Sequence, residues 1–151
     1  MTSRNLPLSS EADASKARSF TRYLPVVVRF LLGLSLVVFG LNAFLNFIPP
    51  PSAPLPEGAA AFAGALMKTG YMMQLIGITQ LAVGVLLVIN RFVPLALVLI
   101  APFLVNSLAF HGFLEPSGLV MAIIFSGLTV YLAWCYRKYY TSVLMARATL
   151  D

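Results

Sequence analysis

Four long apolar runs divide this chain, at residues 24–48, 71–90, 92–113 and 117–136, and they contain almost no charged residues. A helix rises 1.5 Å per residue, so each run approaches or exceeds the ~20 residues needed to cross a ~30 Å hydrocarbon layer. The connections between the later runs, at residues 90–91 and 112–116, are very short, which makes neighbouring helices antiparallel. The pattern predicts an all-α fold: a polytopic membrane four-helix bundle that runs up and down.

The first run has the clearest polar pattern. From Phe30 to Ile48 it carries no charge, and its strongly polar residues are Ser35, Asn42 and Asn46. Pro49–Pro51 then end any helix. Asn42 and Asn46 are four residues apart and therefore share one helix face. An amide that faces lipid is costly unless it finds a partner, so we expect this face to be turned toward the other helices.

The polar ends flank a transmembrane domain at residues 23–140. Residues 1–22 are rich in Ser and Ala without an apolar period, which predicts a disordered cytoplasmic tail with at most a short helix over 11–18. Residues 141–151 form a cytoplasmic C-terminal tail in the same scheme.

The one substantial loop, residues 49–70, combines a proline-rich stretch with a second amphipathic pattern. Ala59, Phe62, Ala63 and Leu66 follow the i, i+3, i+4, i+7 spacing of a helix with one apolar face. We predict a short extracytoplasmic interfacial helix that rests on lipid headgroups. A second interpretation stays open, in which this helix is a lid over the outer mouth of the bundle.

Composition and charge support a membrane protein and give it an orientation. Hydrophobic residues make up 60% of the chain and charged residues 10%, and the mean hydropathy is +0.90; a soluble domain is about 25% charged. The net charge of +5 does not indicate nucleic-acid binding, because the basic residues sit at the ends of the apolar runs. The up-and-down scheme puts Lys68 on one side and nine basic residues on the other: Arg4, Lys16, Arg18, Arg22, Arg29, Arg91, Arg137, Lys138 and Arg147. The positive-inside rule then places both termini in the cytoplasm.

Candidate chemistry comes from polar residues inside the runs. Counting from the helix ends puts Asn42 and Asn106 at similar depth in the outer half, Gln80 near the middle, and Asn46 and His111 closer to the outer surface. These five residues are the candidate ligand-binding set. For the amides two interpretations remain open: hydrogen-bonded glue between helices, worth about 0.6–2 kcal/mol each, or a binding site. His111 can titrate, and an ionisable side chain within a membrane run is a functional candidate.

Several other features predict packing. Gly33 and Gly40, like Gly77 and Gly84, are seven residues apart and would let two helices approach closely. Arg29 is expected to extend its side chain toward the cytoplasmic surface.

The residue inventory limits the chemistry of the chain. Cys135 is the only cysteine, so no internal disulfide forms, and one cysteine with one histidine falls short of a structural zinc site. We therefore expect no metal. Cys135 is interpreted as a buried small apolar residue or a lipidation target. No carboxylate lies within a run, which counts against a proton-driven transporter.

Four segments together resemble the DoxX-like membrane proteins: FGLNAFLNFIPPP, LMKTGY, NRFVPLALVLIAPFLVNSLAFHGFL and YRKYY. The similarity covers residues 29–140. It implies a four-helix bundle in a bacterial cytoplasmic (inner) membrane, in a family named after a subunit linked to thiosulfate oxidation and quinone reduction. Other relatives are tied to thiol and oxidative-stress systems. In the matching motifs, Asn42 falls in FGLN, His111 in FH, and Pro102 and Asn106 in APxxVN.

Two positions depart from the family pattern. Many relatives have a lysine where this chain has Ala43, and many carry a glutamate where Gln80 aligns. The sequence shows no evident cofactor. The resemblance implies an accessory or quinone-associated subunit of a membrane redox or oxidative-stress system, which makes a quinone the candidate cofactor and a membrane or redox protein the candidate partner. It would not be a complete enzyme on its own. The alternatives are a non-catalytic membrane scaffold or assembly factor and, third, a small-molecule exporter.

Overall fold

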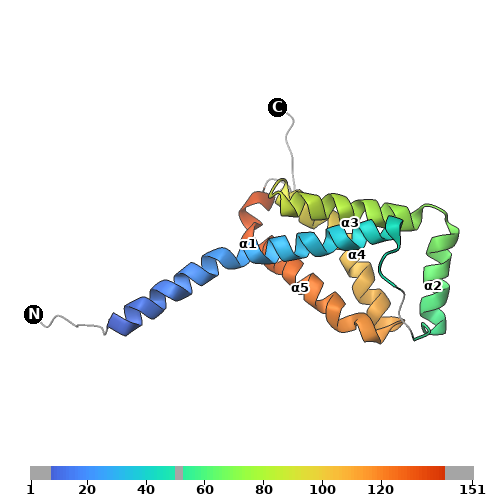
Figure 1. Cartoon of the computed structure of the whole chain (residues 1–151), viewed down its shortest axis with the longest axis horizontal. Coiled ribbons are helices and arrows are strands. Elements are labelled where there is room, and N and C mark those ends of the chain that lie inside the picture. Colours follow the sequence, from blue (N-terminus) through green and yellow to red (C-terminus); the bar gives the residue numbers. More distant parts are fainter. Residues whose placement is uncertain (1–7, 50–52, 142–151) are drawn as a thin grey trace, which may run out of the picture.

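The computed structural model describes residues 8–49 and 53–141, with side chains from residue 23 onward, and every regular element in these residues is helical. The prediction of an all-α fold is confirmed. The elements, in chain order, are α1 (Leu8–Leu45), α2 (Glu57–Lys68), α3 (Met72–Val88), α4 (Val93–Phe113), the short 3-10 helix η1 (Pro116–Gly118), α5 (Leu119–Cys135) and the 3-10 helix η2 (Arg137–Tyr140) (Figure 1).

Three helical segments are long and apolar enough to cross a membrane: Tyr23–Leu45 within α1, Val93–Phe113 and Pro116–Cys135. The fourth predicted span corresponds to α3, whose 17 residues rise about 25 Å. α3 passes the same test only together with α2, and the two helices are bent by 89°. The described residues therefore contain three candidate spans, or four if the bent pair counts as one, and this supports the prediction of a membrane protein.

The ends of α1 differ from the prediction. The helix begins at Leu8, so it covers most of the segment predicted to be a disordered tail, and Figure 1 shows its first part projecting beyond the other helices. Alanine, glutamate, lysine and arginine in this segment favour helix, and an existing helix needs no new nucleus to extend. α1 ends at Leu45, three residues before the predicted end. Residues 1–7, 50–52 and 142–151 lie outside the described residues, and so do the parts of the predicted tails that fall there.

Glycines hold α1 against α3 along a close seam, which confirms the predicted close approach. A Cβ added at Gly40 would lie 2.7 Å from the backbone nitrogen of Leu81 and 2.9 Å from the carbonyl oxygen of Gly77. A Cβ at Gly84 would lie 2.7 Å from the carbonyl oxygen of Gly33. Any side chain at these positions would push the two backbones apart. The two helices run side by side in Figure 1.

The apolar core lies at the end of the helices away from α2. Leu32 of α1, Leu87 of α3, Ile100 of α4 and Leu132 of α5 are all buried to 2% exposure or less, and they belong to one cluster. These residues come from the start of the apolar part of α1, the end of α3, the first half of α4 and the end of α5. We call this the packed end.

Arg29 also belongs to the packed end, and the prediction that it extends toward the surface is wrong. Its side chain is 7% exposed, and Nη1 donates to the carbonyl oxygens of Leu87 and of Val88, the latter at 3.3 Å. The last turn of a helix leaves carbonyl groups without intrahelical partners and carries the negative end of the helix dipole. Arg29 therefore caps the C-terminus of α3.

Candidate functional site

A cavity of about 500 Å³ lies between α1, α3, α4 and α5 at the end covered by α2. Its wall is mostly apolar and rich in aromatic rings: Phe39, Phe62, Phe103, Phe110 and Phe125. Five polar side chains also line it: Asn42, Gln80, Asn106, Ser107 and His111. A concave, mainly apolar space with a few convergent polar groups is the usual form of a small-molecule site.

The structure brings four of the five candidate residues to this one cavity. Asn42 comes from α1, Gln80 from α3, and Asn106 and His111 from α4. Asn46 does not line it. Asn46 is exposed and has a φ of 49°, the left-handed conformation that commonly follows the last turn of a helix and that asparagine tolerates.

Asn42 has a local structural role in addition to its place in the cavity wall. Its Oδ1 accepts a hydrogen bond of 2.7 Å from the backbone nitrogen of Ile48. The side chain therefore holds the segment that leaves α1, and it does so within its own chain segment rather than between helices. Its amide nitrogen makes no hydrogen bond with another described residue and can donate to a bound molecule.

Gln80 is the most informative residue of the wall. Its side chain is 8% exposed, and within the described residues it forms no hydrogen bond. Its amide atoms remain accessible from the cavity, so they can donate to and accept from a molecule bound there. Asn106, which is more exposed, likewise bonds to no described side chain or backbone group. Neither amide joins two helices, as the glue interpretation requires.

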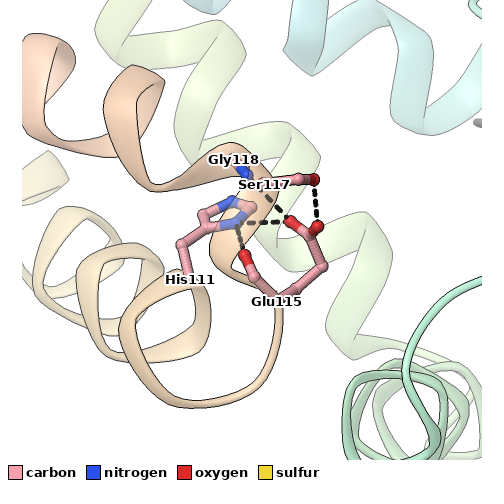
Figure 2. A network of polar contacts seen from close by, with 4 residues as sticks. All are labelled: His111, Glu115, Ser117 and Gly118. Carbon is pink, nitrogen blue, oxygen red and sulfur yellow. Dashed lines mark hydrogen bonds and ion pairs between the residues drawn. The ribbon is translucent and has the colours of Figure 1, made fainter.

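His111 is held by a carboxylate at the α4–η1 corner (Figure 2). Its Nδ1 lies 2.8 Å from Oε2 of Glu115 and 2.9 Å from the backbone oxygen of Glu115. Both partners accept hydrogen bonds, so Nδ1 carries the proton, and Nε2 is left as an acceptor when the ring is neutral. Glu115 also accepts from the hydroxyl of Ser117 and from the backbone nitrogen of Gly118, the latter at 3.1 Å.

These contacts shift the titration of the carboxyl group. The hydrogen bond from Ser117 is the largest cause that lowers the pKa of Glu115 below its ordinary value, and Gly118 and His111 act in the same direction. Partial burial opposes them, but the net shift is downward. Glu115 is therefore held in its charged form beside the imidazole.

Gly118 leaves room for the imidazole of His111. A Cβ there would overlap the imidazole ring of His111, which packs directly on the Gly118 backbone (Figure 2). Sequence reasoning missed this group because Glu115 and Gly118 lie beyond the apolar run that contains His111. The available signal was the spacing of His111 and Glu115, four residues apart, which brings the two side chains together when the chain continues to turn.

α2 covers the open end of the cavity. The predicted apolar face is confirmed, since Ala59 is fully buried and Phe62, Ala63 and Leu66 line the cavity. The ring of Phe62 lies 5.6 Å from that of Phe110, measured between centroids. These contacts match the lid interpretation, because the apolar face is turned toward the other helices.

The corner between α2 and α3 fixes this position. Thr69 Oγ1 donates to the carbonyl oxygen of Leu66 at 2.6 Å and accepts from the backbone nitrogen of Met72 at 3.0 Å, so one hydroxyl bonds to both helices. Gly70 follows with a φ of 76°, a conformation that a side chain would oppose, and α2 ends just before it.

The single cysteine lies away from the cavity. Cys135 is exposed at the far end of α5, so the interpretation of a buried small residue is wrong. Among the described residues, no three His, Cys, Asp or Glu side chains are grouped as metal ligands. Ala43, where the family pattern has a lysine, lines the cavity and packs against Gly77.

In comparisons with known proteins, no family model, curated protein or solved structure matches the chain.

Proposed function

We propose that this chain is a DoxX-like four-helix protein of the bacterial inner membrane that binds a quinone and serves as an accessory subunit of a membrane redox or oxidative-stress system. The observation that carries the proposal is Gln80, whose amide makes no hydrogen bond with another described residue and faces a mostly apolar cavity of about 500 Å³. That volume lies within the range of about 300–1,000 Å³ typical of ligand sites.

The chemistry of the wall fits a quinone ring. Aromatic side chains offer flat apolar surfaces, and the amides of Gln80 and Asn106 offer hydrogen bonds to ring oxygens. An amide has both donors and an acceptor, so it can pair with a carbonyl oxygen of the oxidised form and with a hydroxyl of the reduced form. A bound quinone would supply two-electron, two-proton redox chemistry, and a partner protein would exchange the electrons.

The residues around the cavity have separate tasks in this proposal. Gln80 and Asn106 orient the ring, the apolar face of α2 excludes water, and His111 holds a proton at Nδ1 beside Glu115. This hydrogen-bonded pair sits at the corner of the wall, where the chain leaves the apolar segment.

The distribution of charge supports the proposed orientation. Arg91, Arg137 and Lys138 belong to the packed end, whereas Glu57 and Lys68 flank α2 at the other. The positive-inside rule puts the packed end and both termini in the cytoplasm. The cavity then opens toward the outer side of the membrane, with α2 as an interfacial helix over it.

Native mass spectrometry of the protein, extracted gently from its own membrane, tests the proposal. We expect the wild-type protein to retain a quinone and Gln80→Leu to lose it. Ile78→Leu, a substitution on the same helix at an exposed position that does not line this cavity, is the matched control and should retain it. A wild-type protein that carries only a stoichiometric partner chain, with no small molecule, would contradict the proposal and support the scaffold alternative.

A further inference from the structure

A second cavity of about 310 Å³ lies beside the first, between α3 and α4. Five residues line it without lining the first cavity: Met72, Leu75, Thr79, Leu99 and Pro102. We call it the side cavity and the first one the main cavity.

The side cavity and the main cavity share part of their walls. Five residues line both: Phe62, Leu66, Ile76, Phe103 and Asn106. Residues that border two cavities form the boundary between them, so the two spaces meet at Phe103 and Asn106 of α4 and under the α2 residues. The two cavities are therefore adjacent and have a common wall.

The side cavity leads to the outer surface of the helices. Leu75 is 51% exposed and Leu99 is 48% exposed, although both line this space. Large apolar side chains exposed on candidate spanning helices face lipid when the protein is in a bilayer. The side cavity therefore opens sideways between α3 and α4, toward the hydrocarbon layer.

Polarity changes from one space to the other. The main cavity carries the amides and the histidine, whereas the side cavity is almost entirely apolar. Its one hydroxyl, on Thr79, donates to the carbonyl oxygen of Leu75 at 2.8 Å and so is already bonded within its helix. Asn106, at the boundary, is the one polar group with access to both. A molecule with a polar head and an apolar tail matches this change from a partly polar wall to an apolar one.

We propose that the two cavities form one site for a tailed quinone: the ring occupies the main cavity, and the isoprenoid tail passes through the side cavity into the lipid. This proposal rests on the proposed function, because it assigns a path to the tail of the same ligand. It also gives the ligand an access route within the membrane, so that α2 need not move for the quinone to bind.

The test compares a tail-less benzoquinone with its decyl-tailed analogue, using the full chain in lipid nanodiscs. Thr79→Trp places an indole in the side cavity and leaves the main cavity lining intact, and Leu99→Trp does the same from α4. Ile78→Trp, at a position that is 54% exposed and lines neither space, is the control. We expect both cavity-filling variants to weaken binding of the tailed analogue at least about tenfold, the equivalent of losing the burial of about two methylene groups. Binding of the tail-less ring should stay within about twofold of wild type, because nothing in the main cavity changes.

The outcomes separate this proposal from the proposed function. If the wild type binds both ligands and the filling variants leave the preference for the tailed one unchanged, the tail path is wrong and the proposed function stands. The tail path is also wrong if Ile78→Trp weakens the tailed analogue as much as the filling variants do. If the wild type binds neither ligand, both proposals fail. The second filling variant decides the outcome if the first does not fold.

Discussion

The same helices are packed differently at their two ends. At the packed end, Leu32, Leu87, Ile100 and Leu132 fill the space between α1, α3, α4 and α5. At the other end, which we call the hollow end, these helices enclose a cavity of about 500 Å³. Figure 1 shows the reason: α4 and α5 diverge from the α1–α3 pair toward the end where α2 lies. The helices thus form a wedge whose open side α2 covers.

The difference indicates that stability and binding are located in different parts of the molecule. Arg29 satisfies the carbonyl groups at the end of α3, and the glycine seam keeps α1 on α3, so the packed end and the seam hold the helices together. The hollow end contains Gln80, whose amide makes no hydrogen bond with another described residue and faces an open cavity. An open space lined by unpaired amides is typical of a binding site, where function is retained at the expense of packing.

Enlarging a glycine of the seam should have the largest effect. Gly84→Leu places a side chain against the backbone of Gly33 and should lower the free energy of unfolding by at least about 3 kcal/mol, because two helix backbones must separate. Gly127→Leu is the control, since a Cβ at Gly127 of α5 meets nothing within 4 Å. Unfolding in detergent, followed by circular dichroism, measures both. Equal losses would show that the seam does not hold the fold together.

A matched pair of isoleucines compares the two ends directly. Ile100→Ala, at the fully buried packed end, should lower the free energy of unfolding by about 3 kcal/mol through lost burial and a new cavity. Ile76→Ala, in the wall of the main cavity, should cost about 1 kcal/mol, because its side chain already faces an open space. The same unfolding assay applies. A larger loss for Ile76→Ala would mean that the hollow end carries the stability.

Displacing His111 should change its reactivity more than it changes stability. Gly118→Ala forces the imidazole away from Glu115, because the added Cβ overlaps the ring. We expect the rate of His111 modification by diethylpyrocarbonate, read by mass spectrometry, to rise severalfold. Gly112→Ala, where a Cβ meets nothing within 4 Å, should leave the rate unchanged. An unchanged rate in Gly118→Ala would contradict the contact.

The smallest effect concerns acid stability. The pKa of Glu115 is lowered in the folded state from its ordinary value of 4.5, so the unfolded chain binds this proton more readily. The stabilisation is therefore present above pH 4.5 and is lost as the pH falls through the lower folded-state value. Glu115→Gln should be less stable than the wild type near neutral pH and equal to it in strong acid. A difference that grows on acidification would reverse the sign and refute the assignment.

Hydropathy predicted most of the fold because the thickness of a bilayer sets the length of each apolar run. The ends of α3, α4 and α5 fall within a few residues of the predicted bounds. Depth counting also placed four candidate residues in one cavity, since helix rise converts position into height. Asn46 was wrongly placed in the candidate set because the prediction continued the helix to Ile48. α1 instead ends at Leu45, and Asn46 has a left-handed backbone. The role of Arg29 depends on carbonyl groups 58 and 59 residues away, which no local pattern reveals.

The side cavity could not be predicted from the sequence either. Thr79 and Leu99 look like ordinary lipid-facing positions in an apolar run, and only the divergence of the helices opens a space between them. The contact between His111 and Glu115 was also missed, because depth was counted only within the apolar runs and Glu115 lies just past the run that contains His111.

The most direct test of a binding site at the hollow end is one variant with two readouts, because a binding amide and a structural amide predict opposite results. For Gln80→Leu, we would measure the dissociation constant for a tailed quinone in nanodiscs and the free energy of unfolding in detergent. A binding amide predicts that affinity falls at least about tenfold while stability is unchanged, because Gln80 makes no hydrogen bond to another described residue that the substitution could remove. A loss of about 0.6–2 kcal/mol in stability with unchanged affinity would show instead that Gln80 joins helices, and it would contradict the binding site.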